Sequence, residues 1–252
     1  MHEAMKMKDD EIKKFVKKTY AKVATSGCSC CGDSSLMPSG VELARLVGYS
    51  HDELKDVPAA VKEVFAGCGN PVAVSELKTG ETVLDLGSGG GLDAFLAAKK
   101  VGTTGRVVGI DFTKEMIRKA MRNAGELGLK NVEFRLGDAE DMPVEANSID
   151  IVISNCVINL APDKAKVFKE AYRVLKPGGR IVISDIVTEG ELPDEIRRDP
   201  RYWAECVAGA LDIEDYLGKI RKAGFKHVKV LSRTNFTNTI PSIKVKAQKP
   251  ED

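Results

Sequence analysis

The chain has 252 residues, 43% of them hydrophobic, which is enough for one sizeable α/β domain with additions or for two small domains. Its 38 lysine and arginine side chains nearly balance its 37 aspartate and glutamate side chains, so no strong net charge favours nucleic acid or an anionic membrane as a partner. We therefore expect a small-molecule partner.

The N-terminal segment MHEAMKMKDDEIKK is charged where a secretion signal would be apolar. No apolar run approaches the roughly 18 residues that a membrane-spanning helix needs, so we predict a cytoplasmic protein, and we expect a monomer. Six cysteines in a reducing compartment do not suggest a disulfide framework. Each cysteine therefore needs another explanation.

Residues 1–60 are predicted to form an N-terminal arm and cap, ahead of a main domain over residues 61–252. Within the arm, Ile12, Phe15, Val16 and the pair Thr19 and Tyr20 have helical spacing among lysines. Such a helix either covers the mouth of a ligand site or extends into solvent, and the sequence leaves both open. The arm also contains the Gly- and Ser-rich segment SGCSCCGDSS, with Cys28, Cys30 and Cys31.

From residue 81 onward, short apolar segments alternate with amphipathic ones. The expected strands cover residues 83–87, 106–111, 132–137, 149–154 and 180–187, and the expected helices cover residues 91–100, 114–128 and 163–175. This alternation is typical of a parallel sheet with helices on both faces. After a polar insertion at residues 188–211, a last helix precedes two strand candidates, HVKVLSR and SIKVKA, which we expect to add an antiparallel pair at one edge. The predicted fold is therefore an α/β fold with a seven-stranded, mostly parallel sheet.

The segment VLDLGSGGGLD organises this domain. It combines a short buried strand, a turn built almost entirely from glycine, and the start of a helix at Leu92. Glycine tolerates positive φ and leaves the backbone open to a ligand, and the N-terminus of the helix offers unpaired N–H groups. The second strand ends in Asp111, about 20 residues after the last glycine, where a carboxylate can bind the two hydroxyl groups of a ribose.

These features fit a nicotinamide or flavin dinucleotide as well as S-adenosylmethionine, and three details favour the latter. The loop GDAEDMP after the third strand places Asp138 and Ala139 where a carboxylate and a backbone N–H can contact the edge of an adenine. A single glycine-rich turn suits one adenosine without a pyrophosphate. The turn LKPGG and the paired edge strands complete a pattern that resembles the Rossmann-like fold of class I S-adenosylmethionine-dependent methyltransferases.

The resemblance covers residues 60–250 and implies how the cofactor is held. It implies that the first strand and the glycine turn hold the methionine part, that Asp111 binds the ribose, and that two residues after the second strand line the adenine slot. Of these two, Met116 could equally be an ordinary packing residue of its helix. The implied cofactor-binding residues are Asp85, Gly87, Ser88, Gly89, Asp111, Phe112, Met116, Asp138, Ala139 and Asn155.

Three further cysteines lie far apart in the sequence, yet each is predicted to lie at the carboxyl edge of the sheet. Cys68 is in the turn GCGNP before the first strand, Cys156 follows the fourth strand, and Cys206 is in the insertion. Ligands bind at this edge in open α/β sheets. One such cysteine could be an ordinary small buried side chain, but three together favour a site for a soft, thiophilic atom.

The segments GCGNP, SNCVINL and WAECVAGAL, with SCCG upstream, resemble those of arsenite methyltransferases. The resemblance implies that Cys68, Cys156 and Cys206 bind trivalent arsenic, whose lone pair attacks the methyl group of S-adenosylmethionine. The expected activity is methylation of arsenite and methylated arsenicals, for arsenic detoxification. Two alternatives are a class I methyltransferase that acts on another small molecule, such as a quinone, and a thiol-based metalloid-binding protein without turnover.

Methylation leaves arsenic formally pentavalent, so two electrons must return before another cycle. In the family an upstream cysteine forms a disulfide with the first ligand cysteine, which implies pairing of Cys68 with Cys30 or Cys31, and the sequence leaves the choice between these two open. A small thiol or a thioredoxin-like protein is the expected reductant of that disulfide. A structural zinc site at Cys28, Cys30 and Cys31 is the alternative, but it lacks a fourth ligand.

Overall fold

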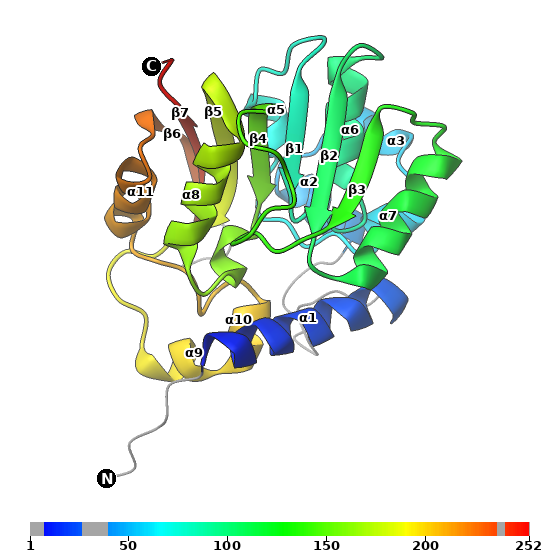
Figure 1. Cartoon of the computed structure of the whole chain (residues 1–252). Helices are drawn as coiled ribbons and strands as arrows, with labels where there is room; N and C mark the ends of the chain where they lie inside the picture. The colour runs from blue at the N-terminus through cyan, green and yellow to red at the C-terminus, as the bar shows by residue number, and fades with distance from the viewer. Residues whose placement is uncertain (1–7, 27–39, 236–239, 252) are drawn as a thin grey trace.

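The computed structural model describes residues 8–26, 40–235 and 240–251, and Figure 1 shows the chain as a ribbon. Cys28, Cys30 and Cys31 lie outside the described residues, and so do the disulfide and the zinc site predicted for them. Among the helices that are described, none is long and apolar enough to cross a membrane.

A seven-stranded sheet forms the centre of the molecule, in the order β3-β2-β1-β4-β5-β7-β6 (Figure 1). Strands β1 to β5 pair in parallel, whereas β7 is antiparallel to both β5 and β6. The strands are β1 Thr82–Leu86, β2 Arg106–Asp111, β3 Val132–Leu136, β4 Ile149–Asn155, β5 Leu175–Ile186, β6 Lys226–Asn235 and β7 Pro241–Gln248. The predicted seven-stranded, mostly parallel sheet is confirmed, with the reversed strand β7 one position in from the edge strand β6.

The fifth strand starts earlier than the sequence predicted, at residue 175 and not at residue 180. Leu175 already pairs with Ile149, and the register then shifts so that Arg180 pairs with Ile151. The KPGG segment lies within this irregularity, and Gly178 has a φ of 77°, which glycine adopts without steric cost. The predicted turn is therefore an irregularity inside one long strand.

Alternating side chains of the strands divide the core into two layers. On β1, Leu84 and Leu86 belong to one layer and Val83 belongs to the other, as expected for a strand whose side chains alternate. The first layer includes residues of α8 and α11, and the second includes residues of α6 and α7. These helices are α6 Leu92–Val101, α7 Lys114–Glu126, α8 Lys164–Val174 and α11 Ile213–Lys222. Both faces of the sheet are thus covered, and the ends of the strands are left for a site.

Four short helices precede the sheet and extend the second core layer. They are α2 Gly40–Leu46, α3 His51–Lys55, α4 Ala59–Lys62 and α5 Pro71–Val74. Tyr49 and Phe65 pack edge to face in this region, with ring centroids 5.3 Å apart. This packing supports the loop 66–70, which carries Cys68.

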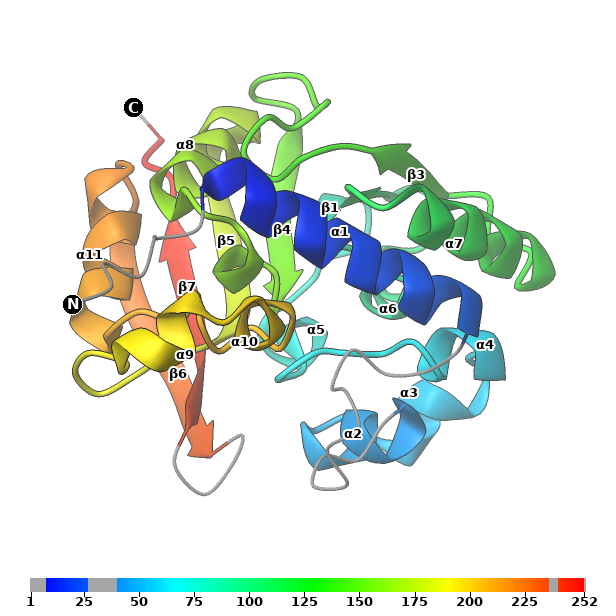
Figure 2. The same ribbon diagram turned by 90° about the horizontal axis from the view of Figure 1, so that it is seen from below.

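Helix α1 (Asp9–Ser26) lies across the carboxyl ends of the strands, beside α10 (Pro200–Ala204), as the two views show (Figure 1 and Figure 2). Its buried face includes Val23 and Ala24, which pack with Val64 and Met116. The Nζ atom of Lys119 on α7 donates to the carbonyl oxygen of Ala24 at 3.1 Å. The sequence left open whether this helix covers a ligand site or extends into solvent. In the structure it packs across the carboxyl ends of the strands and does not extend into solvent.

We expect Phe95→Ala on α6 to destabilise the fold by about 3 to 5 kcal/mol, because it removes a completely buried ring and leaves a cavity. Phe95 packs edge-on against Phe134, with a centroid distance of 5.9 Å, and its ring lies against Gly91 of the glycine turn. Urea unfolding followed by circular dichroism measures the loss. Met121→Ala, at an exposed position of α7, is the control and should change the free energy of unfolding by less than ~0.5 kcal/mol. Equal losses in the two variants would contradict this account of the core.

Candidate active site

Backbone hydrogen bonds hold the glycine turn after β1. The N–H groups of Gly87 and Ser88 donate to the carbonyl oxygen of Ile110 at 2.8 and 2.9 Å. Gly87, Gly89 and Gly91 have φ angles of 71°, 51° and 101°, a region that favours glycine. A Cβ atom at Gly89 would meet no atom within 4 Å, so the backbone there faces open space. The turn can therefore receive a ligand against its bare backbone, although hydrogen bonds within the protein already use the N–H groups of Gly87, Ser88 and Gly89.

Two adjoining cavities lie over this turn and share Gly87, Asp111 and Phe112 in their walls. The first is also lined by Asp85, Ser88, Gly89, Met116 and Asn155, and the second by Asp138 and Ala139. Every residue predicted to hold the cofactor thus lines one of the two cavities. Met116 additionally packs against helix α1, so it also has the packing role considered for it.

Buried carboxyl groups line the first cavity. Asp85 is 2% exposed, and its Oδ2 atom has no hydrogen-bond partner within the described part of the chain. Burial, together with the nearby Asp93, raises the pKa of Asp85 well above its usual range. Burial also raises the pKa of Asp111, although hydrogen bonds from the backbone of Thr113 and Gly89 oppose that rise. An unpaired buried carboxyl group is costly, so this cavity suits a ligand that brings a cationic or donor group to Asp85.

Helix α1 supplies two residues to these cavities that the sequence did not single out. Tyr20 lines the first cavity, and its hydroxyl group donates to the carbonyl oxygen of Ala204 at 3.3 Å. Lys13 lines the second cavity, and its Nζ atom lies 2.7 Å from Asp138 Oδ2 and 2.8 Å from Glu140 Oε2. Asp138, predicted to contact an adenine, is thus paired with a lysine 125 residues away in the sequence. The helical pattern of the arm was the one sequence signal that pointed to this region.

Cys68, Cys156 and Cys206 come together in one buried cluster, although they belong to three distant segments. Cys68 lies on the loop before α5, Cys156 follows β4 and lines the first cavity, and Cys206 follows α10. The Sγ atom of Cys206 donates to the carbonyl oxygen of Cys156 at 2.9 Å. Burial and contacts with the other two thiols raise the pKa of Cys156 well above its usual value. Cys156 is therefore a protonated thiol at neutral pH.

Two of these cysteines have an unusual backbone conformation. Cys156 has a φ of 59° and Cys206 has a φ of 64°, in the left-handed region that few residues other than glycine adopt. Cys156 is held there by its N–H group, which donates to the carbonyl oxygen of Ser184 on β5 at 2.8 Å. Such conformations concentrate at functional sites, where the surrounding structure compensates for their strain.

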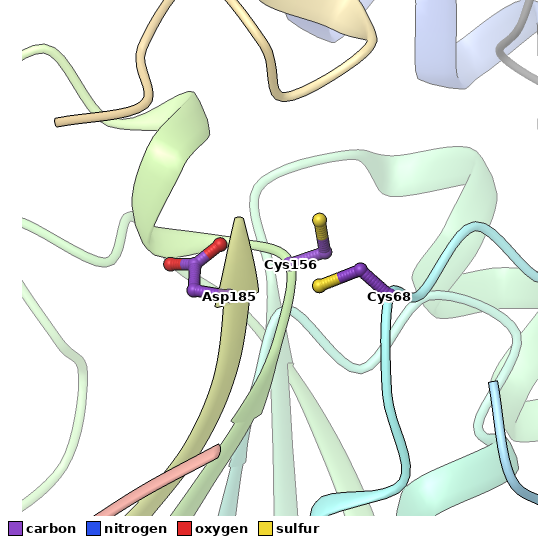
Figure 3. A group of neighbouring side chains, drawn as sticks. All are labelled: Cys68, Cys156 and Asp185. Atoms are coloured by element: carbon purple, nitrogen blue, oxygen red, sulfur yellow. The ribbon is translucent and has the colours of Figure 1, made fainter. Parts of the chain in front are cut away.

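The structure brings Asp185, which the sequence analysis did not single out, to this cluster. One carboxylate oxygen of Asp185 and the Sγ atoms of Cys68 and Cys156 all lie within 4.8 Å of one another (Figure 3). Burial raises the pKa of Asp185 to about 7. Lys164 is buried nearby, and burial lowers its pKa to about 8. The signal that could have found Asp185 is an acidic residue near the carboxyl end of the fifth strand, as Asp111 is in the second.

The side chain of Asn155 links the cysteine cluster to the first cavity. Its Oδ1 atom accepts hydrogen bonds from the backbone N–H groups of Cys68 and Gly69 at 3.0 and 3.2 Å. Its Nδ2 group lies 2.9 Å from the hydroxyl oxygen of Tyr49 and 3.1 Å from Asp93 Oδ2. The Tyr49 hydroxyl group in turn donates to Asp93 Oδ1 at 2.5 Å. Asn155 therefore lines the cavity and also holds the Cys68 loop against its wall.

Comparison with known proteins gives consistent matches. A family model described as a methyltransferase domain matches residues 77–224. The arsenite methyltransferases of Halobacterium salinarum and Homo sapiens are 44% and 37% identical, over 92% and 87% of this chain. The matches cover 61% and 59% of those proteins, so the chain spans about three fifths of the length of these curated relatives. The solved structure of CrArsM, an arsenic(III) S-adenosylmethionine methyltransferase from Chlamydomonas reinhardtii, is 35% identical with a TM-score of 0.65, and the match covers 85% of this chain and 74% of that chain.

We expect Asn155→Ala to speed the alkylation of Cys68 by about tenfold or more, because the backbone of the loop loses three hydrogen bonds to this side chain that contribute ~1 kcal/mol each. Iodoacetamide labelling, followed by mass spectrometry of the peptide that contains Cys68, measures the rate. The matched control is Asn131→Ala, which removes an asparagine that donates to the carbonyl oxygens of Ala98 and Gly102, away from the cysteines. An unchanged labelling rate in Asn155→Ala would show that other contacts hold the loop.

Proposed function

We propose that this chain, which belongs to the arsenite methyltransferase family and has the Rossmann-like class I methyltransferase fold, transfers the methyl group of S-adenosylmethionine to trivalent arsenic. The observation that supports the proposal most strongly is the cluster of Cys68, Cys156 and Cys206 beside the cavity over the glycine turn. Three thiols suit a soft, three-coordinate centre. A methyltransferase that acts on a quinone, or on another carbon or oxygen acceptor, would have no use for them.

When bound, S-adenosylmethionine supplies a sulfonium methyl group that the lone pair of trivalent arsenic can take up without a general base. We assign its methionine part to Asp85, whose unpaired oxygen needs a donor, and to the open backbone of the glycine turn. Asp111 is the proposed acceptor for the ribose hydroxyl groups. Asp138 and Ala139 are the proposed contacts of the adenine, so Asp138 must then share or exchange its contact with Lys13.

The thiols are proposed to take up arsenite by ligand exchange. Each As–O bond that breaks is replaced by an As–S bond, and the proton of the thiol leaves with the hydroxide as water. The raised pKa of Cys156 means that it enters this exchange as a thiol. All three cysteines are buried, so the bound arsenic is shielded from water and held in one orientation beside the cavity, which lowers the barrier to transfer.

Methylated arsenic is formally pentavalent and has to be reduced before the next cycle. Two thiols that form a disulfide return two electrons and release two protons, and an external thiol then reopens the disulfide. We propose Cys68 as one of these thiols and Cys30 or Cys31 as the other, with a small thiol or a thioredoxin-like protein as the reductant. This chemistry needs a reducing compartment, such as the cytoplasm predicted from the sequence. The predicted monomer would suffice, because one chain supplies every proposed group.

Incubation of the purified chain with arsenite, methyl-labelled S-adenosylmethionine and a thiol tests the proposal. We expect labelled methylated arsenicals, separated by chromatography. Cys156→Ser and Cys206→Ser should reduce this product to background while cofactor binding persists, because each variant loses a proposed arsenic ligand. Cys28→Ser removes a cysteine with no assigned role and should keep the normal rate.

Two outcomes of this experiment would count against the proposal. Normal turnover in Cys156→Ser or Cys206→Ser would contradict the proposed ligand set. Stoichiometric binding of arsenite without any labelled product would instead support a metalloid-binding protein.

We expect Asp111→Ala to weaken the binding of S-adenosylmethionine by about 1.5 to 3 kcal/mol for each charge-assisted hydrogen bond that is lost, which is about tenfold or more in Kd. Isothermal titration calorimetry measures the change. Asp52→Ala is the control, because Asp52 is an exposed aspartate remote from the cavities. An unchanged Kd in Asp111→Ala would remove Asp111 from the proposed ribose site.

A further inference from the structure

The carboxyl group of Asp185 belongs to the thiol cluster but has no part in the chemistry proposed above. It is completely buried near the end of β5, and one of its oxygens lies within 4.8 Å of the Sγ atoms of both Cys68 and Cys156 (Figure 3). Cys206 is not in this trio, and its Sγ atom donates to the carbonyl oxygen of Cys156 instead. In the described part of the chain, two sulfurs and one oxygen thus form a group of ligand atoms that all lie within 4.8 Å of one another.

Hydrogen bonds fix the carboxyl group in this position. The hydroxyl group of Tyr216 donates to Oδ2 at 2.9 Å, the backbone N–H of Ile186 donates to Oδ1 at 3.2 Å, and the backbone of Asn159 also hydrogen-bonds to the carboxylate. A carboxylate can accept about four hydrogen bonds in all, so acceptor capacity remains for a ligand between it and the thiols. Lys164 favours the charged carboxylate by its proximity, while its own Nζ atom donates to the carbonyl oxygen of Ala161 at 3.0 Å.

Resting on the proposed function, we propose that Asp185 is a substrate-binding residue that accepts a hydrogen bond from a hydroxyl group on arsenic. When Cys68 and Cys156 bind arsenite, As(OH)3, two As–O bonds break and two As–S bonds form. Each thiol proton leaves with a hydroxide, so two water molecules are released and one hydroxyl group stays on arsenic. This hydroxyl group lies on the side of Asp185, and Cys206 can later displace it to complete a set of three sulfur ligands.

The same geometry distinguishes arsenite from its first methylated product. Methylarsonite, CH3As(OH)2, gives up both of its hydroxyl groups to two thiols, and its remaining ligand is a methyl group that has no proton to donate. Asp185 therefore stabilises the two-thiol complex of arsenite and not that of methylarsonite. It is a specificity group for the two-thiol stage of substrate binding, before Cys206 binds.

Equilibrium binding in a Cys206→Ser background tests this inference, because both arsenicals then stop at two sulfur ligands. We expect Asp185→Asn to weaken arsenite binding about tenfold, the loss of one charge-assisted hydrogen bond. Methylarsonite binding should change by less than about twofold, as for a site away from the ligand. Isothermal titration calorimetry with each arsenical, in the absence of S-adenosylmethionine, gives the ratio of the two affinities without any turnover.

Tyr216→Phe in the same background is the matched control. It keeps the carboxylate, which the N–H group of Ile186 still holds, and removes only the hydroxyl group that donates to Oδ2, so the ratio of arsenite to methylarsonite affinity should stay unchanged. If circular dichroism shows that the Asp185→Asn variant is not folded, Asp185→Ser is used in its place. The expected change in the ratio of arsenite to methylarsonite affinity is then the same as for Asp185→Asn.

Equal weakening for the two arsenicals would overturn the inference, and so would the same change of ratio in Tyr216→Phe, since either result indicates a role in packing alone. Unchanged arsenite binding in Asp185→Asn would overturn it as well and would leave the proposed function intact. Failure of the unmodified chain to bind arsenite would contradict the proposed function itself, and with it this inference.

Discussion

The carboxyl ends of five parallel strands meet at one edge of the sheet, and every proposed binding group depends on this constraint. Strand β2 ends at Asp111, β4 leads into Cys156, and β5 carries Asp185 close to its end. Neighbouring strands lie only about 4.8 Å apart, so these side chains converge without long loops. The loop with Cys68 and the insertion with Cys206 reach the same edge, which places sulfur atoms next to the cavity over the glycine turn.

This edge concentrates buried carboxyl groups, which a packed apolar core would avoid. Asp85, Asp93, Asp111 and Asp185 are all buried, and burial is the largest effect that raises the pKa of each. The two apolar layers around the sheet supply the stability that allows such groups to persist. Asp85, whose Oδ2 atom has no partner among the described residues, fits a ligand that brings a donor or a cation into the cavity and so offsets the cost of burial.

Helix α1 contacts both the cavities over the glycine turn and the insertion that carries Cys206. Near its start, Lys13 pairs with Asp138 at the cavity that we propose for the adenine. Further along, the hydroxyl group of Tyr20 donates to Ala204, which lies just before the turn that carries Cys206. One helix therefore contacts both the proposed cofactor site and the insertion that contributes to the thiol cluster.

Local hydrophobic patterns and the common direction of parallel strands were enough to predict most of the strands and helices, the glycine turn and the carboxyl-edge position of three cysteines, although β5 begins at Leu175 and not at residue 180. The packing of distant segments, in contrast, gives α1 its covering role and brings Lys13 into contact with Asp138, 125 residues away. The same packing brings Asp185 to the thiols, which requires β5 to pair beside β4. Contacts of this kind depend on how distant elements pack in three dimensions, and no local pattern of residues specifies them.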